Sequence, residues 1–161
     1  MADLPAIEKE LRARIKGRVA IMGVGNIMRG DDGLGPAFIG LLKDKNVNAA
    51  LFDCGTVPEN YIFPILRSAC DTLVVVDAAD IGLAAGEPVV LGLEDISAVS
   101  FSTHNPSPRL FVDLLRTGNP DLNVCVVPVQ PKQTTLGAPL SPEVEKGIAV
   151  LADIFVRALS V

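Results

Sequence analysis

The 161-residue chain has no tryptophan, one tyrosine, one histidine and three cysteines. The cysteines, Cys54, Cys70 and Cys125, are irregularly spaced, which argues against a disulfide framework and against a paired-cysteine metal site. No apolar run approaches the roughly 20 residues that a membrane-spanning helix needs. The amino-terminal segment is charged throughout and lacks the apolar core of a secretory signal. These absences predict a cytoplasmic protein that does not insert into membranes.

Positive charge is also scarce, with 14 Lys and Arg against 19 Asp and Glu and a formal net charge of −5. The basic residues form no stripe, so the electrostatic signature of nucleic-acid binding is missing. No serine or cysteine lies in a nucleophile elbow, and the chain contains no HExxH zinc-protease motif. The sequence therefore offers no support for a conventional serine, cysteine or zinc protease.

Apolar residues are plentiful, at 49% of the chain, and they are mostly small aliphatic types. The length is that of one domain, so we expect residues 1–161 to form a single unit. Residues 1–17 are predicted to be an amino-terminal helical extension, capped by Asp3, that covers an edge of the domain.

Beyond this extension, apolar segments of strand length alternate with segments of helical periodicity. Strands are predicted at 18–25, 48–53, 72–77, 88–92 and 123–129, and helices at 36–45, 58–69, 106–116 and from 142 onward. This alternation is typical of crossover units. The predicted fold is a three-layer α/β domain with a mainly parallel, twisted five-stranded sheet and helices on both faces.

Open α/β sheets bind ligands beyond the carboxyl ends of their strands. Asp31 and Asp32 follow the first predicted strand, Asp77 ends the third, and His104 follows the fourth after a short stretch. Carboxylates and the only histidine are therefore expected to meet at one edge of the sheet.

Each of these residues also has a structural interpretation. Asp77 can serve loop amides, and His104 can be a half-buried histidine with satisfied hydrogen bonds. Asp31 and Asp32 are adjacent and cannot point the same way, and spacing does not say which one faces the site. Two carboxylates and an imidazole nonetheless suit a divalent metal such as Ni²⁺ or Zn²⁺. The nearby glycines do not complete a dinucleotide-binding fingerprint, because Met28 occupies the third glycine position.

Four separated segments resemble the nickel–iron hydrogenase maturation endopeptidases. They are GVGNIMRGDDGLG at 23–35, DCGTVPEN at 53–60, VDA at 76–78 and STHNP at 102–106. The chain looks most like the hydrogenase 3 (formate hydrogenlyase-type) branch, because Asp32 stands where the other well-known branch carries Glu. Gln130 and Pro131 are also similar to that branch.

The resemblance implies a twisted sheet flanked by helices and a metal-binding set of Asp32, Asp77 and His104. Asp32 and Asp77 are also the candidate catalytic carboxylates, and the sequence does not say which of them acts as general base. The implied substrate is a hydrogenase large-subunit precursor, from which a carboxyl-terminal peptide is removed after nickel insertion. Nickel would come with the precursor, although other divalent metals can substitute in the isolated protein, which we expect to be a monomer. A nickel-sensing chaperone that does not cleave is the main alternative. A phosphoacceptor receiver-like domain is disfavoured, because Lys132 comes too late after the fifth strand.

Overall fold

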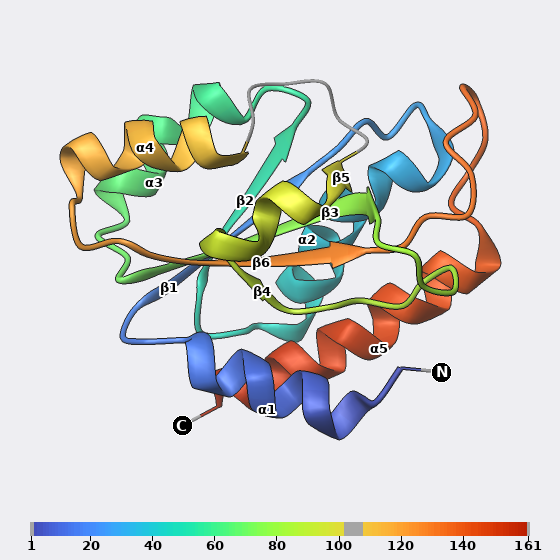
Figure 1. Cartoon of the computed structure of the whole chain (residues 1–161), viewed down its shortest axis with the longest axis horizontal. Coiled ribbons are helices and arrows are strands. Elements are labelled where there is room, and N and C mark those ends of the chain that lie inside the picture. The colour runs from blue at the N-terminus through green and yellow to red at the C-terminus, as the bar shows by residue number, and fades with distance from the viewer. Residues whose placement is uncertain (1, 102–107, 161) are drawn as a thin grey trace.

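The computed structural model describes residues 2–101 and 108–160, and its centre is a twisted sheet (Figure 1). Four neighbouring strands are parallel, in the order β2 (Ala50–Gly55), β1 (Val19–Val24), β3 (Thr72–Asp80) and β6 (Asn123–Val129). Strand β1 is buried over its whole length, and β3 and β6 over almost all of theirs. A parallel strand covered on both faces has a nearly continuous apolar sequence, which is why these strands were predictable.

The fourth predicted strand, at 88–92, is only partly correct. Strand β4 contains just Leu91–Gly92 and runs antiparallel to β6 at the sheet edge, with an isolated bridge between Pro88 and Val129. Proline cannot donate to a strand ladder, so Pro88 limits this segment to an edge strand. A further short strand that the sequence did not predict, β5 (Ser100–Phe101), pairs antiparallel with the end of β3.

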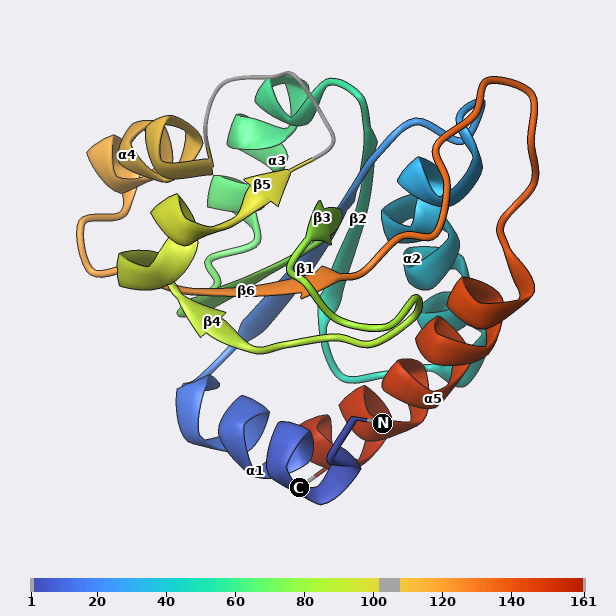
Figure 2. The same cartoon turned by 45° about the vertical axis from the view of Figure 1, so that its right-hand side comes forward.

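Helices cover both faces of the sheet, as predicted (Figure 2). Helices α2 (Leu34–Lys45) and α5 (Pro142–Leu159) pack on one face, and α3 (Ile62–Arg67) and α4 (Pro108–Gly118) on the other. Successive strand residues point to opposite faces. Accordingly Ile21 of β1 belongs to the core under α2 and α5, whereas its neighbour Met22 belongs to the core under α3 and α4.

Several helix boundaries differ from the prediction. Helix α2 begins at Leu34, two residues earlier than expected. The helix predicted at 58–69 is a 3₁₀ turn, η2 (Pro58–Tyr61), followed by α3. Pro64 therefore lies in the first turn of α3, where its missing N–H has no intrahelical partner to lose, and the break comes before it. The predicted start of α4 at Pro106 lies outside the described residues. No helix in the described ranges combines the length and apolarity needed to cross a membrane.

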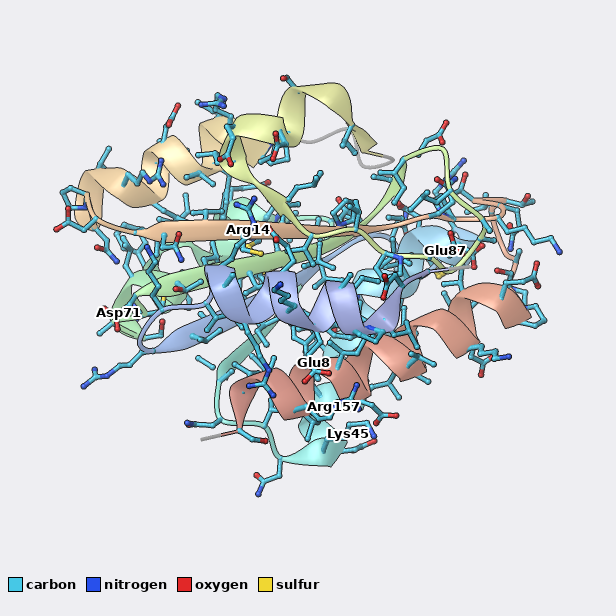
Figure 3. The ribbon with its side chains drawn as sticks, turned by 60° about the horizontal axis from the view of Figure 1, so that its bottom comes forward. Glu8, Arg14, Lys45, Asp71, Glu87 and Arg157 are labelled. Atoms are coloured by element: carbon cyan, nitrogen blue, oxygen red, sulfur yellow. The ribbon has the colours of Figure 1, made fainter. Side chains whose placement is uncertain are left out.

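The amino-terminal helix, α1 (Leu4–Arg14), confirms the predicted helix and its Asp3 cap. The Asp3 carboxylate accepts a hydrogen bond from the Ala6 N–H at 3.1 Å, and Leu11 is buried in the core under α5. Figure 3 shows α1 beside α5, with Glu8 and Arg157 next to each other. The Arg157 Nε lies 3.0 Å from the Glu8 Oε2, so an ion pair joins the two helices.

Candidate active site

The loop after β1 holds both adjacent aspartates in one 3₁₀ turn, η1 (Gly30–Gly33). Gly25, directly after the strand, has a φ of 149°, and a Cβ at this position would collide with the carbonyl oxygen of Asp32. The end of β1 therefore lies against the backbone of Asp32, which only a glycine permits. Gly25 therefore lets the chain turn sharply away from the strand.

Asp32 is buried, and its Oδ2 accepts a hydrogen bond from the Asn26 N–H at 3.1 Å. The turn that carries it contacts β3. Helix α2, which follows at once, packs very closely on the sheet. A Cβ on Gly35 would clash with the Val24 carbonyl oxygen and lie 2.9 Å from that of Val76. This close approach places Asp32 beyond the ends of β1 and β3.

Asp77 is a second buried carboxylate, near the end of β3 in the middle of the sheet. Its register partner in β6 is Pro128, and the preceding Val76 pairs with Gly23 of β1. The Asp77 Oδ1 accepts a hydrogen bond from the N–H of Ala78 at 2.8 Å. Asp32 and Asp77 therefore lie at the same, carboxyl edge of the sheet, as the strand order predicted.

His104, the third predicted metal ligand, lies outside the described residues. Strand β5, shortly before it in the sequence, pairs with Ala79 and Asp80, just beyond Asp77. Within residues 2–101 and 108–160, no group of three His, Cys, Asp or Glu side chains is placed to hold a metal ion. The metal-binding roles of Asp32, Asp77 and His104 therefore stay predictions.

Asp31 is completely buried, and its described hydrogen-bond partners differ from that of Asp32. Its carboxylate accepts four hydrogen bonds, all from the segment between β6 and α5. The donors are the N–H groups of Lys132, Gln133 and Ser141, at 2.8, 3.1 and 2.7 Å, and the Ser141 hydroxyl, at 2.8 Å. Asp31 thus fastens one loop to another, and the structure resolves which of the two adjacent aspartates does so.

The cysteines are buried, as expected for small apolar residues. Cys54 lies near the carboxyl end of β2. Burial, with the nearby Asp53 adding to it, raises the pKa of the Cys54 thiol to about 12. A buried thiol with a raised pKa is a poor nucleophile at neutral pH, so the site gains no support for cysteine chemistry. Lys132, the lysine considered for a receiver-like site, is exposed and pairs with Glu143 at 2.6 Å.

Sequence reasoning missed the structural part played by the segment from Gln130 to Ser141. Figure 2 shows this segment beside the loop that follows β1. Besides the bonds to Asp31, the Gln130 Oε1 accepts hydrogen bonds from the N–H groups of Ile81 and Leu83, at 2.8 and 3.4 Å. Gln130 and Pro131 had been noted only as similar to one family branch. The available signal was a polar segment rich in proline at the carboxyl edge of the sheet, which is where site loops gather.

Comparison with known proteins gives a consistent picture. The model of a family described as hydrogenase maturation protease, HycI, matches residues 40–158. The hydrogenase 3 maturation protease of Escherichia coli (strain K12) is 36% identical over 102 residues, which are 60% of this chain and 63% of that protein. This chain thus spans less than two thirds of that relative. A putative hydrogenase maturation protease of Methanocaldococcus jannaschii is 27% identical over 137 residues, covering 81% of this chain and 84% of the relative.

Solved structures extend the likeness to the first loop. The NiFe hydrogenase maturation protease HycI from Thermococcus kodakarensis KOD1 superimposes with a TM-score of 0.80 at 28% identity, covering 92% of this chain and 97% of that one. The endopeptidase HycI from Escherichia coli gives a TM-score of 0.75, also at 28% identity, over 85% of this chain and 88% of the other. Asp77 and His104 fall within the family match, whereas Asp32 precedes it.

Proposed function

The chain belongs to the hydrogenase maturation protease family, and from this premise we propose that it is an endopeptidase acting on a nickel–iron hydrogenase large-subunit precursor. It removes a carboxyl-terminal peptide once nickel has been inserted, and it acts as a monomer in the cytoplasm. The observation that carries the proposal is the pair of buried carboxylates, Asp32 and Asp77, at one sheet edge in a chain whose thiols are all buried. Such a site needs an electrophile from elsewhere.

In this proposal the nickel belongs to the substrate. Asp32, Asp77 and His104 complete its coordination, which holds the scissile peptide close to the metal. A metal ion in that position polarises the peptide carbonyl or lowers the pKa of a bound water. A carboxylate that is not bound to the metal, Asp32 or Asp77, accepts the proton from the attacking water.

The same arrangement accounts for selectivity. A precursor without nickel gives the three side chains nothing to hold, so its peptide bond is not brought into position. The isolated protein, with three ligands at most, binds Ni²⁺ or a substitute such as Zn²⁺ only weakly. Large-subunit precursors are thereby checked for metal before they are cut.

The test is electrophoretic mobility of the precursor, with and without nickel, after incubation with the wild type or with Asp77→Ala. We expect the wild type to cut only the nickel-loaded form and Asp77→Ala to cut neither. Displacing a reacting group by about 1 Å can reduce a rate by roughly a hundredfold. Efficient cutting of the nickel-free form would refute the mechanism. Binding of the loaded precursor without any cutting by the wild type would identify a chaperone instead.

A further inference from the structure

Three large apolar side chains are exposed beside the candidate site. Ile27, Met28 and Leu136 expose 70%, 61% and 65% of their surface, which places them among the most exposed large hydrophobic residues described. Ile27 and Met28 belong to the loop after β1, and Leu136 belongs to the segment between β6 and α5. We call these three residues the two-loop rim. Neighbouring exposed apolar side chains of this size commonly mark an interaction site.

The rim is held in place by hydrogen bonds between its two loops. The Gly137 N–H donates to the Met28 carbonyl oxygen at 2.7 Å, and the Gly30 N–H donates to that of Ala138 at 3.1 Å. The Asp31 carboxylate, with four hydrogen bonds to the second loop, fastens the two segments further. The apolar side chains are thus presented on a fixed backbone, and little ordering entropy remains to be lost when they bind.

A single asparagine joins the rim to the candidate catalytic carboxylate. The Asn26 N–H donates to the Asp32 Oδ2 at 3.1 Å, while the Asn26 side-chain oxygen accepts from the Met28 N–H at 2.9 Å. Ile27 lies between Asn26 and Met28 in the sequence. Its backbone packs closely against Gly33, the neighbour of Asp32, since a Cβ built on Gly33 would lie 2.9 Å from the Ile27 Cα. A polypeptide that brings a peptide bond to Asp32 therefore passes next to the rim.

We propose that the two-loop rim is the docking surface for an apolar stretch of the precursor polypeptide that flanks the scissile bond. This inference rests on the proposed function, since it takes the occupant to be the protein substrate of the site. Continuity with Asp32 selects that occupant over a second copy of the chain. A membrane surface is a poor match, because the chain carries 19 acidic against 14 basic residues and anionic lipids attract basic patches.

The experiment compares the double variant Met28→Ser, Leu136→Ser with a matched control, Phe63→Ser. Phe63 is also 70% exposed but lies on α3, on the other face of the sheet. Steady-state cleavage of the nickel-loaded precursor should show a KM raised about tenfold or more in the double variant, with kcat nearly unchanged, as expected when an apolar contact surface is truncated. The control should keep the wild-type KM, and all three proteins should unfold at similar temperatures.

A wild-type KM in the double variant, or an equal change in the control, would overturn the rim proposal and leave the proposed function standing. Sedimentation that shows a wild-type dimer lost in the double variant would also overturn it, by making the rim a contact between copies. If the wild type cleaves nothing, the proposed function fails. The rim proposal is then tested separately by measuring how tightly each protein binds the precursor. Weaker binding by the double variant than by Phe63→Ser supports the rim, whereas equal binding or none refutes it.

Discussion

Replacing Asp31 by asparagine should destabilise the protein, although Asp31 is adjacent to a candidate catalytic residue. The Oδ2 of Asp31 accepts hydrogen bonds from Lys132, Gln133 and the Ser141 hydroxyl, and its Oδ1 accepts one from the Ser141 N–H. An asparagine best keeps its carbonyl oxygen at the position with three donors. Its NH₂ group then faces the buried Ser141 N–H, so that two donors meet and one hydrogen bond is lost.

The magnitude follows from these contacts. Leaving a buried donor unsatisfied costs about 1–3 kcal/mol, and the remaining bonds also lose their charge-assisted strength. We expect Asp31→Asn to lower the free energy of unfolding by about 2 kcal/mol, and Asp31→Ala, which orphans all four donors, by about 4 kcal/mol. For a domain of this size, 2 kcal/mol corresponds to a fall in Tm of roughly 4–8 °C.

Asp32→Asn is the matched control, because an asparagine oxygen can keep the described bond from the Asn26 N–H. Its Tm should stay within about 3 °C of the wild type, a change of less than about 1 kcal/mol. Calorimetric unfolding measures the stabilities, and precursor cleavage well below both Tm values measures function. We expect Asp31→Asn to retain much of the processing activity and Asp32→Asn to abolish it. Equal stability of the two variants would refute the assignment of Asp31 as the inter-loop tie, and the reverse pattern of activity would exchange the two roles.

Other outcomes follow from the same structure. Gly35→Ala should lower the free energy of unfolding, measured in urea, by about 1–3 kcal/mol, because its Cβ meets the ends of β1 and β3. Gly40→Ala, which has open space around it on the same helix, should raise that free energy by up to about 1 kcal/mol. Similar values for the two variants would contradict the close packing at Gly35. Alkylation at pH 8 should be negligible for Cys54 and Cys125 until the chain unfolds, since burial raises the pKa of each thiol to about 12. Mass spectrometry measures the labelling, and rapid labelling of either thiol in the folded protein would contradict the prediction. The hydrogen bond from Arg157, and then that from Arg12, lowers the pKa of Glu8 below its ordinary 4.5. The contribution of Glu8 is therefore present above pH 4.5 and lost as the pH falls through the lowered value, and Glu8→Gln should flatten the pH dependence of stability in that window. Calorimetric titration with Zn²⁺ should show weak binding by the wild type and none by His104→Ala, and equal binding would remove His104 from the predicted set.

The fold was largely predictable because its central strands are buried on both faces. Residues 73–76 of β3 form a continuous apolar run, and a strand that is buried on both faces appears in the sequence as such an uninterrupted hydrophobic segment. The edge was less predictable. At 88–92 the apolar pattern indicated a full strand, but Pro88 has no N–H to donate to a ladder. The strand is limited to Leu91–Gly92, with an isolated bridge at Pro88. The helix predicted at 58–69 was also only partly correct, because the sequence does not show that residues 58–61 form a 3₁₀ turn before α3 begins.

The candidate site was predictable where strand order alone determines position, and not where a contact depends on tertiary packing. Asp32 follows β1 and Asp77 lies near the carboxyl end of β3. Because these two strands are parallel neighbours, both carboxylates come to the same edge of the sheet. The separate roles of Asp31 and Asp32 could not be predicted in this way, since two adjacent residues in a turn give no periodic signal. It is decided by partners about a hundred residues away, Lys132, Gln133 and Ser141, whose N–H groups point at Asp31. Ser141 also caps α5 through its hydroxyl, and nothing local in the sequence indicates that this hydroxyl binds the buried carboxylate of Asp31. The same long-range bonds fasten together the two loops that present Ile27, Met28 and Leu136, so the fixed geometry of the rim depends on Asp31, a residue outside the predicted metal-binding set.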